Sequence, residues 1–167
     1  MKKSMLIIAL ASITMVGGCT KKASSDLPPP PADQDGGGYS SGDGKPAPGS
    51  QADFIASIES DHIYFDTDKY NIDADDQRIL QSQAQWLVRY PQKQIVVEGH
   101  CDERGTRDYN LALGERRANA AKNYLAAIGV DPSRISVVSY GKERPVALGS
   151  DESAWAQNRR AVTITVE

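Results

Sequence analysis

The sequence contains few of the residues from which metal sites and nucleophilic centres are built. Its 167 residues include two cysteines and two histidines, which is a poor basis for a zinc site made of those side chains. The net charge is -3, so no basic surface for nucleic-acid phosphates is expected. No apolar run reaches the roughly 20 residues that a membrane-spanning helix needs. The remaining composition, 40% hydrophobic and 25% charged, is typical of a globular protein.

Residues 1–18 have the pattern of a signal peptide. Lys2 and Lys3 precede an apolar run over residues 5–16, which ends in Val-Gly-Gly before Cys19. A charged start, a short apolar stretch and small residues before the cut are typical of secretory signals. The end of this segment resembles the lipobox of bacterial lipoproteins. An ordinary secretory signal that happens to contain a cysteine is the alternative.

The lipobox resemblance implies that Cys19 becomes the first mature residue and carries a diacylglycerol and an amide-linked acyl chain. Three acyl chains exceed the two signals that stable membrane attachment requires. Lipoproteins of this kind with aspartate after the cysteine tend to stay in the inner membrane, whereas this chain has Thr20. We therefore expect a protein that is anchored by lipid in the outer membrane and faces the periplasm.

Residues 19–52 have the composition of a flexible linker. Residues 20–52 hold six of the nine prolines and six of the fourteen glycines, with Leu27 and Tyr39 as the only large apolar side chains. Such a segment cannot bury enough apolar surface to offset its ordering entropy. As a coil it spans roughly 30 Å, and fully extended about 110 Å. We therefore expect a disordered, lipidated tether before a folded domain at residues 53–167.

The pattern of residues 53–167 predicts an α+β, two-layer domain of order β-α-β-α-β-β, with helices on one face of a mixed sheet. The first helix is expected to begin near Asp73, with acidic residues at its positive end, and to end before Pro91. The second has the clearest periodicity and is followed by Gly129 as a C-cap. Its expected buried stripe comprises Leu111, Gly114, Ala118, Ala121, Leu125 and Ile128. Strands are predicted at 62–65, 94–98, 135–139 and 161–166, and a short helix is an option at 153–158.

His100, Cys101 and Asp102 are adjacent, which raises the question of a catalytic thiol. Neighbours in an extended segment point to opposite faces, so His100 is badly placed to take a proton from Cys101. We therefore predict no catalytic residue. Cys101 is expected either to pack as a small side chain at a strand end or to form an occasional intermolecular disulfide.

Residues of opposite charge form the candidate binding site. Asp68 follows the first predicted strand and Asp102 follows the second, and loops at one edge of a sheet can converge. Leu113 and Arg117 share a face of the second predicted helix with Asn110, next to the buried stripe. On charge pattern alone, a structural ion pair is the simpler interpretation.

Several stretches closely resemble the peptidoglycan-binding domain of the OmpA-like family. The resemblance covers roughly residues 62–167 and departs from the family pattern at Cys101, where alanine or threonine is more usual. The matching stretches are YFDTDKY at 64–70, VEGHCDERGT at 97–106, YNL at 109–111, LGERRAN at 113–119, VSYGKERP at 138–145 and NRRAV at 158–162.

The resemblance implies a ligand, the peptidoglycan peptide stem that contains meso-diaminopimelate. It implies that Asp102 accepts the ammonium at the end of the diaminopimelate side chain and that Arg117 binds the neighbouring carboxylate. A planar guanidinium suits that carboxylate, and a stem with lysine would leave Arg117 unpaired. Asp68 matches a further ligand contact and Leu113 a wall of the pocket. Arg159 and Arg160 are expected to fix the last strand, with a contact at the rim as the alternative.

The resemblance also implies a non-enzymatic protein without cofactors. Lipid on Cys19 would hold the outer membrane and the folded domain would hold the cell wall. The implied setting is the Tol system, with the propeller protein TolB as partner and a role in envelope integrity and cell division. Two alternatives remain open: a cell-wall hydrolase, and an interaction-only module of this fold without a wall ligand.

Overall fold

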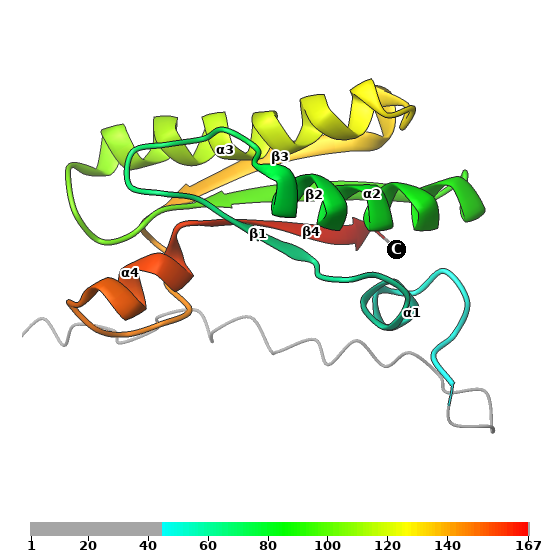
Figure 1. Cartoon of the computed structure of the whole chain (residues 1–167), viewed down its shortest axis with the longest axis horizontal. Helices are drawn as coiled ribbons and strands as arrows, with labels where there is room; N and C mark the ends of the chain where they lie inside the picture. Colours follow the sequence, from blue (N-terminus) through cyan, green and yellow to red (C-terminus); the bar gives the residue numbers. More distant parts are fainter. Residues whose placement is uncertain (1–44, 167) are drawn as a thin grey trace, which may run out of the picture. The chain divides into compact units, whose positions relative to one another are not determined.

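The computed structural model describes residues 45–166, so the predicted signal peptide, Cys19 and most of the predicted linker lie outside the described residues. The α+β class and the predicted order of helices and strands are confirmed, the optional helix is present as α4, and α1 and a 3₁₀ turn are additional (Figure 1). The elements are α1 (Gln51–Ser57), β1 (His62–Tyr64), α2 (Ala74–Arg89), β2 (Gln94–His100), α3 (Arg107–Ala127), η1 (Pro132–Arg134), β3 (Ile135–Gly141), α4 (Glu152–Asn158) and β4 (Arg160–Val166).

The four strands form one mixed sheet in the order β1-β4-β2-β3. The last strand, β4, lies between β1 and β2 and is antiparallel to both, whereas β2 and β3 are parallel. The strands β1, β2 and β3 therefore all run in one direction. Their carboxyl ends, and the loops that follow them, lie at the same edge of the sheet.

Helices α2 and α3 share a single core with the sheet. Leu80 and Leu87 from α2, Ala118 and Leu125 from α3, and Val97 from β2 all belong to one cluster of buried side chains. Burying each of these leucine and valine side chains contributes about 1.5–3 kcal/mol, and the methyl group of Ala118 contributes less. Over residues 45–166, no helix is long and apolar enough to cross a membrane.

Helix α2 starts where its acidic residues predict. Asp73 is the N-cap, and its carboxylate accepts hydrogen bonds from the backbone N–H groups of Asp75 and Asp76. The Asp76 carboxylate in turn accepts from the N–H of Asp73, which completes a capping box. The helix ends at Arg89, two residues before Pro91, which agrees with the predicted end.

Helix α3 ends at Ala127, one residue before the last member of its predicted buried stripe. The predicted stripe is buried from Gly114 to Leu125, whereas its first member, Leu111, is half-buried, and Gly129 has a φ of 105°. Bonds from Gly129 N–H to the Ala126 carbonyl and from Val130 N–H to the Leu125 carbonyl form a Schellman C-cap. The prediction for Ile128 was wrong, because this residue is the C-cap and is 38% exposed.

Two glycines let α3 lie directly on β2. A Cβ atom on Gly99 would overlap the carbonyl oxygen of Gly114, and one on Gly114 would overlap the Ser139 hydroxyl. The backbones of the helix and the strand therefore approach more closely than any side chain would permit. This contact sets the distance between the end of β2 and the first half of α3.

Helix α1 begins at Gln51, slightly ahead of residue 53, where the sequence places the start of the domain. Ser50 caps it, and the fully buried Phe54 packs edge-on against Trp86 of α2 with ring centroids 5.0 Å apart. The Gln51 side-chain oxygen accepts hydrogen bonds from the Thr165 backbone N–H and hydroxyl, at 2.7 and 2.8 Å. Helix α1 thus covers the part of β4 that extends past β1.

Candidate functional site

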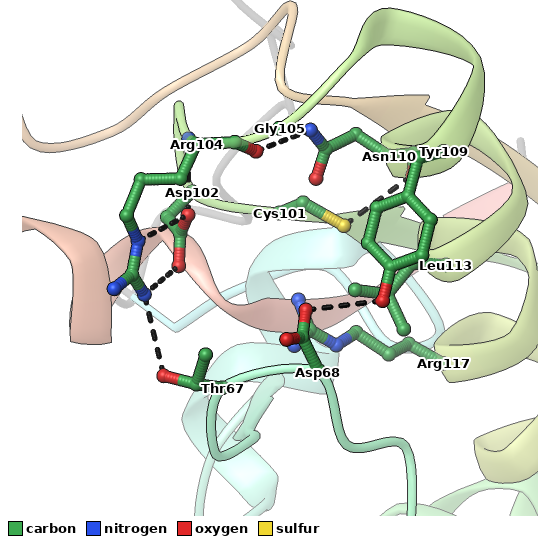
Figure 2. A pocket seen from close by; sticks show the side chains of 10 residues that line it. All are labelled: Thr67, Asp68, Cys101, Asp102, Arg104, Gly105, Tyr109, Asn110, Leu113 and Arg117. Atoms are coloured by element: carbon green, nitrogen blue, oxygen red, sulfur yellow. Dashed lines mark hydrogen bonds and ion pairs between the residues drawn. The ribbon is translucent and has the colours of Figure 1, made fainter.

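A cavity of about 260 Å³ lies where the loops after β1 and β2 meet the first half of α3 (Figure 2). All four residues predicted to bind a ligand line it: Asp68 and Asp102 from the two loops, and Leu113 and Arg117 from α3. The shared direction of β1 and β2 explains why the two loops converge. The other lining residues are Thr67, Cys101, Arg104, Gly105, Tyr109 and Asn110. In the described part of the chain, no three His, Cys, Asp or Glu side chains are grouped to hold a metal ion.

Asp102 is held by two arginines. Its Oδ1 accepts from the backbone N–H and Nε of Arg104, at 3.1 and 3.0 Å, and its Oδ2 accepts from Nη2 of Arg104 at 2.7 Å. Nη1 of Arg159 also donates to Oδ2, at 3.4 Å. Burial raises the pKa of the Asp102 carboxyl, but hydrogen bonds from Arg104 and Arg159 outweigh burial and hold this pKa below its ordinary value. Asp102 is therefore an anion at neutral pH.

Arg117 is fully buried and ties three backbone segments together. Its Nε donates to the carbonyl of Lys69 at 2.9 Å, its Nη1 to that of His100 at 2.8 Å, and its Nη2 to that of Asp66 at 3.0 Å. Burial lowers the pKa of the guanidinium, yet arginine stays protonated in proteins. These bonds use three of the five N–H donors of the side chain. The guanidinium also lines the cavity.

Asp68 brings a second carboxylate to the cavity. Among residues 45–166 it is the only non-glycine residue with a positive φ, 57°. Its Oδ1 accepts from the Tyr109 hydroxyl at 3.1 Å, and this bond raises the pKa of Tyr109. Leu113 lies beside the Tyr109 ring and Arg117 (Figure 2) and gives the cavity an apolar wall. Two carboxylates, the guanidinium groups of Arg104 and Arg117 and an apolar wall therefore line one small space.

Sequence analysis does not assign Arg104, Tyr109 or Thr67 to the site, although all three line the cavity. Nη2 of Arg104 donates to the Thr67 hydroxyl at 3.2 Å and so connects the two loops. Asn110 holds the second loop in shape, since its Nδ2 donates to the carbonyl of Arg104 at 2.7 Å. The stretches that resemble the OmpA-like family include all four residues. These stretches could therefore have identified the four residues as part of the site. Their roles depend on contacts that the sequence does not reveal.

Arg159 fixes the start of β4 against the segment after β1. Its side chain is 7% exposed, its Nε donates to the Phe65 carbonyl at 2.9 Å, and its Nη2 lies 2.6 Å from Oε1 of Glu152. Arg159 donates a hydrogen bond to Asp102 but is not among the residues that line the cavity. Its contacts are those of a structural residue.

Cys101 packs as a small side chain. It is 3% exposed, and its thiol donates to the carbonyl of Asn110 at 3.4 Å. Burial raises the pKa of this thiol to about 11. We expect alkylation of Cys101 by iodoacetamide at pH 8 to be about 100-fold slower in the native protein than in urea, because the thiolate is the reactive form. Mass spectrometry of the Cys101 peptide measures both rates, and equal rates would contradict this expectation.

Similar sequences and solved structures identify the family of this chain. Residues 64–159 match the OmpA family. The peptidoglycan-associated lipoproteins of Agrobacterium fabrum and Rhizobium meliloti are 51% and 50% identical to this chain, and each alignment covers 95% of it and 85% or 86% of the relative. The crystal structure of the peptidoglycan-associated lipoprotein from Burkholderia pseudomallei is 46% identical, with a TM-score of 0.63 over 68% of this chain and 93% of that one. The chain therefore belongs to the OmpA family and, within it, to the peptidoglycan-associated lipoproteins.

Proposed function

We propose that the domain binds peptidoglycan noncovalently at this cavity, through the meso-diaminopimelate end of a peptide stem. One observation carries the proposal: the four residues that the family pattern assigns to the ligand come from three separate segments and line one cavity. A volume of about 260 Å³ suits the end of an amino-acid side chain and is below that of usual drug-sized sites. The name of the relatives, peptidoglycan-associated lipoprotein, supports the same ligand.

The charged groups of the cavity complement the end of the diaminopimelate side chain, which carries an ammonium and a carboxylate. Asp102 accepts the ammonium, with Asp68 as a second acceptor, and the two remaining N–H groups of Arg117 bind the carboxylate. Leu113 packs against the methylene groups. A stem with lysine lacks the carboxylate and leaves the Arg117 donors without a partner, which is costly in a desolvated site.

We further propose that the chain is a non-enzymatic tether. In this proposal residues 1–18 are a signal peptide, lipid on Cys19 anchors the protein in the outer membrane on its periplasmic face, and residues 19–52 link that anchor to the domain. The protein would act in the Tol-Pal system with TolB, and so support envelope integrity and cell division. The relatives named as lipoproteins support this arrangement, because their similarity spans 95% of the chain.

The test uses the full-length protein in mild detergent, mixed with purified cell-wall sacculi that contain meso-diaminopimelate. Asp102→Asn is expected to weaken co-sedimentation about 10- to 100-fold, since a hydrogen bond to a charged group contributes about 1.5–3 kcal/mol. Asp108→Asn removes an equal charge from the first turn of α3 at an exposed position outside the cavity and is expected to bind like the wild type.

Calorimetry with a purified muropeptide then measures the affinity directly. Undiminished binding by Asp102→Asn would contradict the site. Binding to TolB without any binding to sacculi would indicate an interaction-only module. Release of muropeptides from the sacculi would indicate a hydrolase.

A further inference from the structure

The carboxylate of Asp102 has no free acceptor position in this structure. A carboxylate offers about four lone-pair sites. Oδ1 accepts two hydrogen bonds, both from Arg104, and Oδ2 accepts one from Arg104 and one from Arg159. An ammonium can therefore reach Asp102 only if one of these donors leaves.

Of the two arginines, Arg104 is the one that can leave. Its side chain is 39% exposed, whereas that of Arg159 is 7% exposed and is held by Phe65 and Glu152. Besides Asp102, the Arg104 guanidinium contacts the Thr67 hydroxyl and lies 4.2 Å from the centroid of the Trp155 ring. Both of these contacts are at the surface, and a cation–π contact at such a site is weak.

The charges around the cavity point in the same direction. With Arg104 in place, the two guanidinium groups that line the cavity, those of Arg104 and Arg117, balance the carboxylates of Asp68 and Asp102. The charge of Arg159, outside the cavity, is paired with Glu152. Once Arg104 has moved out, the lining of the cavity carries one excess negative charge, which favours the entry of an ammonium.

We propose that Arg104 is a specificity-determining residue whose guanidinium occupies the ammonium position on Asp102 until a ligand ammonium replaces it. This inference rests on the proposed function, because it concerns the same ligand end. Binding then includes the displacement of Arg104, so the apparent affinity is reduced by the fraction of molecules in which Asp102 is free. A ligand that lacks the ammonium leaves Arg104 where it is.

The test is calorimetry of the full-length protein with a muropeptide that carries meso-diaminopimelate. Arg104→Met keeps most of the side-chain length but not the charge, and is expected to bind about 3- to 10-fold more tightly than the wild type. Trp155→Leu removes the stacking partner of Arg104 from outside the cavity and is expected to strengthen binding about 2- to 5-fold. Arg107→Met, the matched control, removes an equal charge at an exposed position and is expected to change nothing.

Two further measurements separate displacement from a general loosening of the loop. A muropeptide acetylated on its distal amine should bind Arg104→Met and the wild type equally, since it does not compete for Asp102. In Arg104→Met the pKa of Asp102 should rise, because burial is no longer offset by Arg104. Binding should then be lost at a higher pH on acidification than in the wild type.

The outcomes distinguish this inference from the proposed function. Binding by the wild type, with equal or weaker binding by Arg104→Met, would overturn the inference and leave the proposed function intact. Absence of binding by both proteins would overturn both. Equal gains in affinity for the free and the acetylated muropeptide would also overturn the role assigned to Arg104.

Discussion

Replacing Arg117 with methionine is expected to remove wall binding and to lower the free energy of unfolding by about 3–5 kcal/mol, the usual effect of breaking a buried charged network. The side chain donates to the carbonyls of Asp66, Lys69 and His100. Without it, three carbonyl acceptors, of which that of His100 is buried, lose their partner, and the loop after β1 loses its attachment to the end of β2. Urea unfolding followed by circular dichroism measures the change.

Arg117→Lys separates binding from stability. Lysine keeps the charge but not the planar geometry that binds a carboxylate at two points. We expect this variant to bind sacculi at least about 10-fold more weakly than the wild type, at a temperature where circular dichroism shows both proteins to be folded. Wild-type affinity in Arg117→Lys would show that a point charge is sufficient, and would contradict the assigned role.

Among substitutions that add one methyl group, Gly99→Ala is expected to lower the stability of the domain most. Its Cβ would overlap the carbonyl oxygen of Gly114, so α3 would have to move away from β2. Overpacking of this kind usually lowers the free energy of unfolding by about 1–3 kcal/mol. Because the added methyl group meets backbone on both sides, we expect a loss of about 3 kcal/mol or more. The measurement is the urea midpoint of unfolding.

The same pair of glycines gives an internal check. Helix propensity alone predicts that Gly114→Ala stabilises α3 by about 1 kcal/mol, whereas the contact with Ser139 and Gly99 predicts destabilisation. Gln94→Ala, at an exposed position on β2, is the control and should change stability by less than about 0.5 kcal/mol. A stabilised Gly114→Ala protein would contradict the close packing.

Local signals in the sequence predict most of the fold. The acidic cap at Asp73 and the spacing of small and apolar residues up to Leu125 locate α2 and α3, because these signals act within one or two helical turns. Helix α1 was missed because its seven residues bury one side chain, Phe54. It depends on a contact with Trp86 and on a hydrogen bond to β4, which no local pattern can show.

The sequence predicts which residues line the cavity, but not how these residues are paired with one another. Asp68, Asp102, Leu113 and Arg117 do line one cavity, as the family pattern and the direction of the strands suggest. The sequence did not reveal that Arg104 saturates Asp102, or that Arg159 approaches the same carboxylate from 57 positions away. Such partners depend on how the loops after β1 and β2 meet the start of β4, which is a property of the assembled sheet edge.

The placement of α1 has a mechanical consequence. A force applied from the N-terminal side acts on α1 before it acts on the strands, and the side chains of Gln51, Asp53 and Phe54 attach α1 to β4 and α2. These few contacts can peel away one after another, whereas the hydrogen bonds between strands must resist shear together. Detachment of α1 would free residues 51–61, whose extended length is roughly 35 Å, and the slack gained is this length less the distance that they span in the fold. We therefore expect α1 to detach under load before the cavity is disturbed.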